Sequence, residues 1–532
     1  MDSVIIPLHW PPQLVGKLSN GTALAGALIL AALLPFVLSW ITADRSIPKL
    51  TSSKSWFASR QDFATHGVEI IEKGFNQVKS GVFRVTALDG SDLILLAPEH
   101  WLTLCKKKDD EVAPARKEFF LCDLHGAPFE EPFLYRYLLA RMPGFDRHLD
   151  VISQALDEGI SSILEKGFDY SNGARKHVII QPQILHVYSH VIWRVILGDS
   201  FTPKVVDIFE KYSATLIPVM KALKAQRPMM ARITAAFSSE VRQVNMQLER
   251  ATAFFTPILQ QHFQAFEQSS GTSSANNEWF EELIRMAPAE KRRDYKFLTN
   301  ILIGFAFTFV FSPGPSTTQV VYEFVFRPDY TDLVLQEARD VLGEQLEDWS
   351  FTRESLRKLS LLDSFCKETH KHHPTAASNL MKKIHKTQTL SNGVVLPAGT
   401  VFEVVMTAAH LSNPSFKDPA EWNGRRYHDL RQQASSATGA SKYDWGAATR
   451  DDVNFGYASH MCPGRWAGCS IAKMFLIKLL SRYEICPENG ETERYRDFHS
   501  GQYVRHALKT CISLAFIYTG IVLNTALTDL RN

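Results

Sequence analysis

The chain has 532 residues, of which 45% are hydrophobic and 11% aromatic, and its formal net charge is +2. This length supports a large buried core, whereas a charge so close to zero argues against a protein that binds nucleic acid through a strongly basic surface. The seven cysteines are scattered and form no CxxC pair, which argues against a disulfide framework or a zinc site and favours a reducing compartment.

The N-terminal region contains a long stretch without charged residues. Residues 22–42 are 21 mostly apolar positions, enough to cross a bilayer as one helix. Basic residues cluster after this stretch, so the positive-inside rule places residues 1–21 in the lumen and the rest of the chain in the cytosol. We expect a tether over 43–60 and a candidate N-glycosylation site at Asn20. The alternative is a buried helix of a soluble protein.

The rest of the chain combines short strand patterns with a long helical region. Residues 80–98 alternate apolar and polar side chains around an Asp-Gly turn, which predicts a β-hairpin. From about 130 to 370, apolar residues recur at helical spacing. Residues 385–406 predict a second hairpin around an Asn-Gly turn, and the helical pattern resumes after Cys462. We expect one mainly α domain with a small β portion over 61–504.

One cysteine lies in a loop suited to hold a metal ligand. Residues 454–468 read NFGYASHMCPGRWAG, with Cys462 before a Pro-Gly pair. A thiolate on haem iron needs a loop that donates backbone N–H groups to the sulfur and excludes water. A helix that begins near Gly464 directs its positive end toward the sulfur. Phe455 is placed to pack beside a porphyrin and His460 to donate to a haem propionate; the alternative is a buried structural thiol.

This loop resembles the haem-binding loop of the cytochrome P450 monooxygenases, Phe-x-x-Gly-x-[Arg/His]-x-Cys-x-Gly, with Ala458 in place of the usual glycine. The likeness covers about residues 80–503 and is closest to fungal, microsomal, ent-kaurene-oxidase-like members. Four further segments follow the family's order, namely 189–198, 356–374, 390–400 and 418–431. The resemblance implies the cytochrome P450 fold, preceded by one transmembrane helix, with haem b bound through Cys462.

The resemblance also implies an activity and partners. The chain would hydroxylate a lipophilic secondary metabolite, such as a terpenoid or an alkaloid, with molecular oxygen. It carries no GxGxxG fingerprint after a strand, so we expect electrons from NADPH through a separate reductase. The expected location is the endoplasmic reticulum membrane, with the catalytic domain in the cytosol. Apolar residues around 205–235 and 300–310 are expected to line the substrate pocket.

The family's Glu-x-x-Arg motif is altered here, because it runs from Glu368 to Lys371. Residues three apart share a helix face, so the two side chains can pair. Lysine nevertheless lacks the forked guanidinium group of arginine. The expected third member of this structural lock is Arg426, or Arg425 if the alignment shifts by one residue. The alternative is a surface ion pair of little value.

The helix that crosses the haem also departs from the family. Alignment on residues 317–330 places Phe311 and Ser312 where the family has an acid or amide followed by a threonine, which relay protons to bound dioxygen. Ser312 can supply a hydroxyl, whereas Phe311 cannot relay a proton. Pro313 and Pro315 are expected to break the helix, at a cost of about 3 kcal/mol each in a helix interior. The alternatives are a loop over 311–315, or a proton network of water and substrate.

These departures motivate two rival hypotheses. One is a haem-thiolate enzyme that does not use oxygen and catalyses a rearrangement or dehydration, which Phe311 and the prolines favour. The other is a catalytically silent membrane scaffold, which Lys371 and the atypical tail over 505–532 favour. Within that tail, residues 511–523 are apolar but too short for a comfortable membrane span. They form either a core element or a tail that does not dock.

Other basic side chains have two alternative assignments each. Arg136 and Arg141 are both candidates to hold a haem propionate, and either can instead be a solvated helix position. The histidines at the end of the motif helix are expected to be exposed rather than metal ligands. These histidines are His370, His372 and His373.

Overall fold

A computed structural model describes most of the chain beyond its N-terminal region. The described residues are 47–50, 56–165, 175–268, 278–345, 349–487, 494, 498–500, 503–505 and 511–516. The predicted membrane helix at 22–42 and the candidate glycosylation site Asn20 lie outside these residues. The chain divides into two compact units, Met1–Pro48 and Lys49–Asn532, and the second unit is described below.

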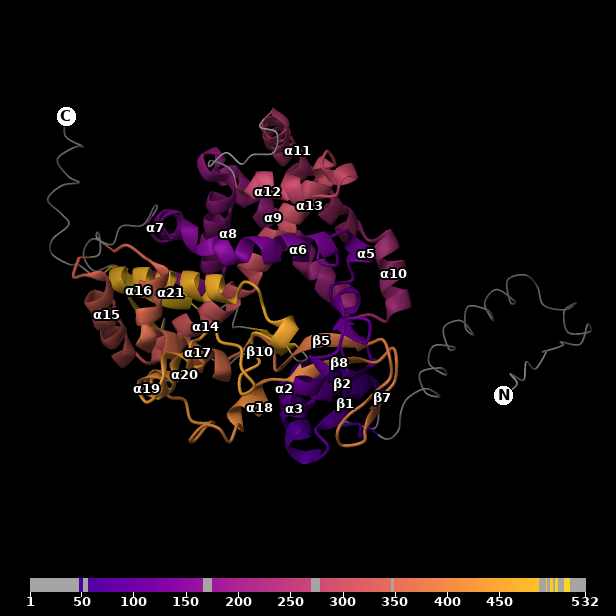
Figure 1. The fold of residues 1–532 in the computed structure, drawn as a ribbon. Helices are drawn as coiled ribbons and strands as arrows, with labels where there is room; N and C mark the ends of the chain where they lie inside the picture. The colour runs from indigo at the N-terminus through magenta and orange to yellow at the C-terminus, as the bar shows by residue number, and fades with distance from the viewer. Residues whose placement is uncertain are drawn as a thin grey trace, which may run out of the picture. The chain divides into compact units, whose positions relative to one another are not determined.

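The second unit consists mainly of helices, with strands gathered in small sheets (Figure 1). Its longer helices are α2 (Trp56–Gln77), α6 (Pro132–Arg141), α7 (Leu149–Leu164), α8 (Ile180–Leu197), α9 (Pro203–Lys224), α10 (Pro228–Phe237), α11 (Ser239–Gln268), α12 (Glu278–Met286), α13 (Tyr295–Phe311), α14 (Pro313–Phe326), α15 (Asp329–Leu342), α17 (Ser360–His372) and α21 (Arg465–Arg482). Its shorter helices are α3 (Pro98–Leu104), α4 (Arg116–Phe120), α5 (Cys122–His125), α16 (Arg353–Lys358), α18 (Thr407–Leu411), α19 (Arg426–Gln432) and α20 (Ala437–Ser441). Short 3-10 turns are η2 (Met142–His148), η4 (Gly198–Ser200), η5 (Ala289–Lys291) and η7 (Ala458–His460). The predicted mainly α architecture with a small β portion is confirmed.

The largest described sheet has five strands in the order β1-β2-β8-β5-β3. These strands are β1 (Val82–Thr86), β2 (Asp92–Leu96), β3 (Val112–Pro114), β5 (Ser378–Ile384) and β8 (Val401–Val405). Strands β1 and β2 pair antiparallel, with Val82 opposite Leu96, so the hairpin predicted over 80–98 is confirmed. The second predicted hairpin is the short antiparallel pair of β6 (Gln388–Thr389) and β7 (Val395–Leu396).

The C-terminal tail contributes to a three-stranded sheet. Strand β12 (Cys511–Phe516) lies between β4 (Arg175–Ile179) and β9 (Tyr483–Pro487) and is antiparallel to both. A short hairpin of β10 (Phe498–Ser500) and β11 (Tyr503–Arg505) precedes it. Of the apolar stretch 511–523, residues 511–516 therefore form an element that docks, whereas 517–523 lie outside the described residues. At the other end of the unit, α2 begins inside the segment 43–60 that the sequence predicts as a tether.

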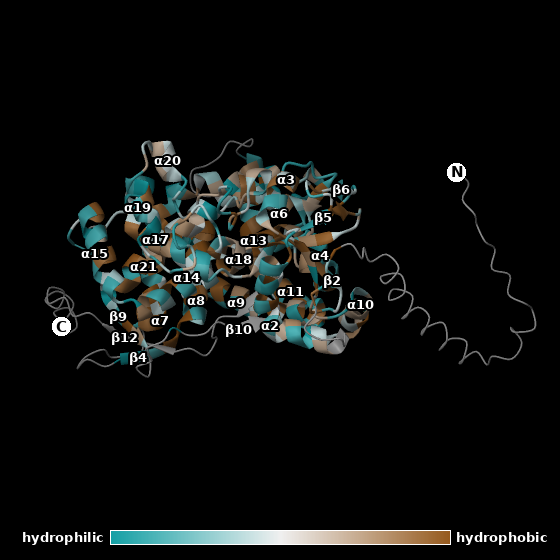
Figure 2. Ribbon diagram, turned by 90° about the horizontal axis from the view of Figure 1, so that it is seen from below, coloured by the Kyte–Doolittle hydropathy of each residue, from teal (hydrophilic) through white to brown (hydrophobic). Residues whose placement is uncertain are grey.

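The core centres on α13 and α14, which pack against α8, α11, α17 and α21. Helix α13 is apolar on nearly all sides, so it is buried on nearly all sides. Surface helices such as α7 and α15 instead alternate hydrophilic and hydrophobic residues along their length (Figure 2). Among the described residues, the stretch Tyr295–Phe326 is long and apolar enough to cross a membrane, but 61% of its most apolar window is buried inside the protein.

The two prolines interrupt this central helix at a single residue. Helix α13 ends at Phe311 and α14 begins at Pro313, while Ser312 between them keeps right-handed angles, φ −92° and ψ −57°. The alternative of a loop over 311–315 is therefore excluded, and the predicted break is limited to Ser312. Both prolines fall in the first turn of α14. Backbone N–H groups in a first turn make no hydrogen bond within the helix, so proline, which lacks this group, is tolerated there.

Candidate functional site

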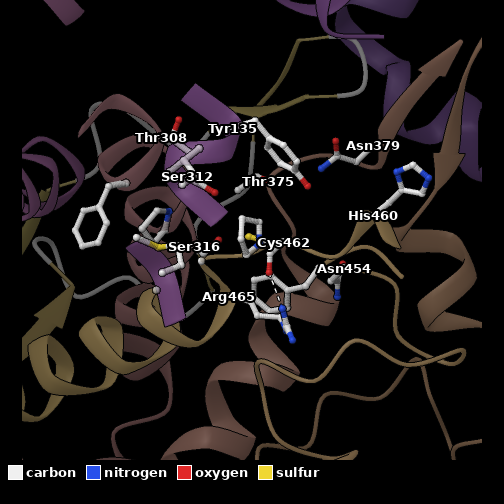
Figure 3. A pocket seen from close by; sticks show the side chains of 18 of the residues that line it. Tyr135, Thr308, Ser312, Ser316, Thr375, Asn379, Asn454, His460, Cys462 and Arg465 are labelled. Carbon is white, nitrogen blue, oxygen red and sulfur yellow. Dashed lines mark hydrogen bonds between the residues drawn. The ribbon is translucent and has the colours of Figure 1, made fainter. Parts of the chain in front are cut away.

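A cavity of about 420 Å³ includes Cys462 in its lining. The lining comes from α4, α6, the junction of α13 and α14, the end of α17, β5, and the loop before α21. Figure 3 shows Thr308, Ser312 and Ser316 along one side of this cavity, Asn379 and His460 along the other side, and Cys462 between them. Segments far apart in the sequence thus enclose the predicted ligand.

The loop around Cys462 is fixed by its own backbone. The N–H of Cys462 donates to the carbonyl of Phe455 at 2.8 Å, and the Arg465 guanidinium donates to the carbonyl of Cys462 at 2.8 Å. Gly456 has φ +79°, and a Cβ there would lie 2.2 Å from the carbonyl oxygen of His460, so only glycine fits. The loop can therefore hold the sulfur at one position.

The environment of the Cys462 sulfur favours a bound cation. Burial raises the pKa of this thiol, and the backbone N–H groups of Gly464 and Arg465 lower it only in part. A thiolate at this position therefore needs a positively charged partner, and a metal ion supplies one directly. The side chain is only partly buried because it faces the cavity.

Ala458 occupies a strained position in the same loop. Its φ is +53°, in the left-handed region that non-glycine residues rarely adopt. The cost of this conformation for an L-residue is about 1–2 kcal/mol. The difference between this chain and the family's glycine pattern therefore has a local energetic cost, although the loop keeps its shape around Cys462.

A cationic edge lies on the His460 side of the cavity. The Nζ of Lys382 is 3.5 Å from Nδ1 of His460, and Arg116 faces the same cavity. Burial, together with the nearby charge of Arg116, lowers the pKa of Lys382 to about 8. Burial likewise lowers the pKa of His460 to about 4, with a further contribution from Lys382. Among the described residues, the cavity lining includes Arg116 but no carboxylate, so this edge fits an anion.

The residues present fit a haem group on two further observations. The buried Nε2 of His460 and Nε of Arg465 have no hydrogen-bond partner among the described residues. Buried polar atoms of this kind normally have a partner. Phe455 lies in the lining beside Cys462 and offers an apolar ring face. The Cys462 thiol can bind iron, the Phe455 ring can pack on a porphyrin, and the cationic edge can pair with its two carboxylates.

The structure places neither candidate arginine from α6 in the cavity lining. Arg136 is exposed and lies 5.7 Å from the centre of the Phe133 ring, and Arg141 lies 4.3 Å from the ring centre of Trp279. Arg116 from α4 takes the place that the sequence assigned to them. No motif marked Arg116 or Lys382, so sequence reasoning missed both residues.

The central helix presents a row of hydroxyl groups to the cavity. Thr308, Ser312 and Ser316 are four residues apart, so they share one helix face, and all three line the cavity. The hydroxyl of Thr308 donates a hydrogen bond to the carbonyl oxygen of Gly304 at 2.9 Å. Phe311 points elsewhere, because its ring packs 4.5 Å from that of Phe307. Ser312, which the sequence offers as the hydroxyl near bound oxygen, belongs to this row.

The altered motif pair, Glu368 and Lys371, is buried. The Nζ of Lys371 lies 3.0 Å from Oε1 of Glu368, and Nε of Arg426 lies 3.1 Å from both carboxylate oxygens. Burial would raise the pKa of Glu368, but a hydrogen bond from His372 and the charges of Lys371 and Arg426 keep it below its usual value. Arg425 is exposed and makes no contact with this carboxylate.

The histidines predicted to be exposed are partly buried, so that prediction is wrong. His370 lines the cavity, where its Nδ1 accepts a hydrogen bond from Trp445 Nε1 at 3.3 Å, and burial lowers its pKa to about 4. His372 lies 3.3 Å from Glu368, and His373 lies 3.1 Å from Glu323. The sequence pattern placed them at a helix end, but α17 ends inside the protein.

Of the two segments predicted to line the pocket, one lines the cavity and the other does not. From the 300–310 segment, Phe305, Thr308 and Phe309 line the cavity. No residue of the 205–235 segment does so among the described residues, because α9 turns its apolar face to α8 and α11.

Comparison with known proteins gives a consistent picture. The family model for Cytochrome P450 matches residues 154–512. Cytochrome P450 monooxygenase BOA4 of Botryotinia fuckeliana (strain B05.10) is 26% identical over 326 residues, which are 61% of this chain and 64% of the relative. Cytochrome P450 monooxygenase ntnM of Nectria sp is 24% identical over 431 residues, 80% of each chain. Pyrichalasin C-7 hydroxylase of Pyricularia grisea is 23% identical over 294 residues, 55% of this chain and 57% of the relative.

The match to BOA4 therefore spans slightly less than two thirds of that relative's length. The family match covers well over half of this chain and includes the Cys462 loop, the Glu368 lock and the central helix. Haem b is the cofactor of this family, and the cavity residues fit it. The chain belongs to the cytochrome P450 family.

Proposed function

We propose that the chain is a haem-thiolate monooxygenase that oxidises a lipophilic small molecule with molecular oxygen. The observation that carries this proposal is the position of Cys462 at the floor of a cavity with aromatic walls and a cationic edge. Relatives named as monooxygenases and as a hydroxylase support it. Haem bound through Cys462 supplies the activation of dioxygen, since a thiolate ligand favours O–O cleavage.

The chain's own side chains hold the cofactor and the substrate. Arg116, Lys382 and His460 would hold the haem carboxylates. Besides Phe455, four phenylalanines line the cavity, where they exclude water and contact an apolar substrate. These are Phe120, Phe129, Phe305 and Phe309. The hydroxyl Oγ of Ser312 faces the cavity and would hold the proton that oxygen activation consumes.

The substrate class, the membrane anchor and the source of electrons are proposed from the sequence likeness. The substrate would be a secondary metabolite of a fungal-type pathway, such as a terpenoid or an alkaloid, and the relative named Pyrichalasin C-7 hydroxylase supports hydroxylation as the reaction. Residues 22–42 would anchor the protein in the endoplasmic reticulum membrane, with residues 61–504 as the cytosolic catalytic domain. Electrons would come from NADPH through a separate reductase. Asn20 would be the glycosylated residue on the lumenal side.

The test is the absorption spectrum of the reduced, carbon-monoxide-bound protein. We expect a strongly red-shifted Soret band of the thiolate type in the wild-type protein, and its loss in Cys462→Ala. A wild-type protein without this band would contradict the proposal and favour a silent scaffold. With a reductase and NADPH, we then expect oxygen-dependent product from a panel of lipophilic substrates.

A second candidate is an enzyme that rearranges or dehydrates its substrate without oxygen. The observation that favours it is that α13, α14 and the junction residue Ser312 bring hydroxyl groups but no carboxylate to the lining of this cavity, as far as the structure describes it. Product that forms without NADPH and reductase would support this candidate. Product that requires both, and that carries an atom from labelled dioxygen, would support the monooxygenase.

A further inference from the structure

Strand β5 contains an irregularity where it borders the cavity. Its pairing with β8 shifts register between Asn379 and Lys382. Within this bulge, Leu380 has φ +58°, a left-handed conformation that is a true outlier for a bulky side chain. Bulges and strained residues of this kind occur next to functional sites, where they redirect a side chain. Both Asn379 and Leu380 line the cavity.

The strained turn is held by Asn379 itself. Its Oδ1 accepts a hydrogen bond from the backbone N–H of Leu380 at 2.8 Å. Only the oxygen of a carboxamide can accept a hydrogen bond, so this bond distinguishes Oδ1 from Nδ2. The Nδ2 group is therefore the free end, and no described residue accepts a hydrogen bond from it. The side chain is exposed although it lies in the cavity lining (Figure 3).

The bulge thus presents a fixed pair of N–H donors to the cavity. An anion is not the expected acceptor, because Arg116 and Lys382, beside His460, already form a cationic edge for carboxylates. A neutral amide instead matches a neutral oxygen, such as a ketone, lactone or hydroxyl oxygen. The neighbouring Leu380 supplies apolar contact beside that donor.

We propose that Asn379 Nδ2 donates a hydrogen bond to a neutral oxygen of the substrate, so that the pocket selects oxygenated lipophilic molecules over their parent hydrocarbons. This inference rests on the proposed function, in which a substrate enters the Cys462 cavity. An analogue without that oxygen would cover the exposed Asn379 donor and leave it unpaired, so the pocket discriminates against that analogue.

The test uses the haem-loaded, full-length protein and two matched probe pairs, camphor with bornane and progesterone with pregnane. Binding is measured by the shift in haem spin state. We expect the wild-type protein to bind the oxygenated member of at least one pair about tenfold more tightly than the hydrocarbon. Asn379→Asp keeps the acceptor for the Leu380 N–H and removes the donors, so it should weaken only the oxygenated probe, about tenfold.

Asn379→Leu should also abolish the preference, while haem content and the carbon monoxide spectrum stay unchanged in both variants. Equal weakening of both probes, or a wild-type protein that prefers neither probe or binds none, would overturn the inference. Loss of haem in Asn379→Asp would show that the amide serves the cofactor and would overturn it as well. A missing thiolate band in the wild-type protein would instead refute the proposed function, so the two failures are distinguishable.

Discussion

The Nζ of Lys371 lies 3.0 Å from Oε1 of Glu368, one turn away on α17, and both side chains are almost completely buried. The lysine thus occupies the place of the family's arginine and keeps the ion pair. Arg426 supplies the guanidinium group that Lys371 lacks, since its Nε bonds the carboxylate and its other nitrogens bond backbone carbonyls, including that of Asp418 at 3.0 Å. The lock is therefore complete despite the substitution.

Removing the charge of Lys371 should destabilise the protein strongly. Lys371→Met leaves Glu368 buried with fewer partners, and loss of one partner from a buried ion pair costs about 3–5 kcal/mol. Lys371→Arg should retain most of the stability. Urea denaturation followed by circular dichroism measures the difference. The matched control is Arg425→Met, because Arg425 is exposed next to Arg426; an equal loss in both variants would contradict the structural role of the lock.

Ala458→Gly should stabilise the cysteine loop. Glycine adopts the φ of +53° without the penalty of a Cβ, so we expect a gain of about 1 kcal/mol in the free energy of unfolding. Ala214→Gly is the control, because Ala214 is exposed within α9 and glycine there should cost about 1 kcal/mol. Thermal unfolding measures both. A loss of stability in Ala458→Gly would show that the left-handed backbone is not strained.

Gly456→Ala should disrupt haem binding. The added Cβ would meet the carbonyl oxygen of His460 at 2.2 Å, so the Cys462 loop has to move. Gly393→Ala is a matched control, because Gly393 has a similar φ of +83° but open space around it. Haem content per protein is the measurement. We expect a large loss in the first variant and a normal content in the second; equal content in both would contradict the geometry.

Ser312→Ala should lower product formation more than electron consumption. The variant removes the hydroxyl that faces the cavity, and a positioned proton donor contributes about a hundredfold to a rate. Ser312→Thr should retain activity. The product formed per NADPH oxidised is the measurement. Thr318→Val is the control, since the hydroxyl of Thr318 donates to the carbonyl of Gly314 and does not line the cavity.

The stability of the protein should decrease as the pH falls below about 6.5. Burial lowers the pKa of His410, even though the Asp452 carboxylate lies 4.0 Å away. In the window between the lowered pKa and the ordinary value of about 6.5, the unfolded chain binds a proton at His410 that the folded protein does not. Stability contributed by the neutral imidazole is therefore present above this window and is lost as the pH falls through it.

The measurement is the free energy of unfolding at pH 7.5 and at pH 5.5 in wild type and His410→Gln. We expect a smaller decrease in the variant, because glutamine does not titrate. The control is His66→Gln, since the side chain of His66 is 62% exposed. An identical decrease in wild type and His410→Gln would contradict the assignment.

The sequence alone determined the features that depend on neighbouring residues. The spacing around Cys462 identified the loop, the three-residue spacing of Glu368 and Lys371 placed them on one helix face, and the Asp-Gly and Asn-Gly turns located two hairpins. Local steric rules and hydrogen bonding set each of these features, so a short window of sequence contains the necessary information.

The tertiary structure alone decided how distant segments meet. It brought Arg116 to the cavity edge and Lys382 beside His460, enclosed His370, and put β12 between β4 and β9. It also showed that prolines in the first turn of α14 leave the central helix almost continuous. Burial and charge proximity depend on packing between segments that are far apart in the chain, and a local pattern does not record which segments pack together.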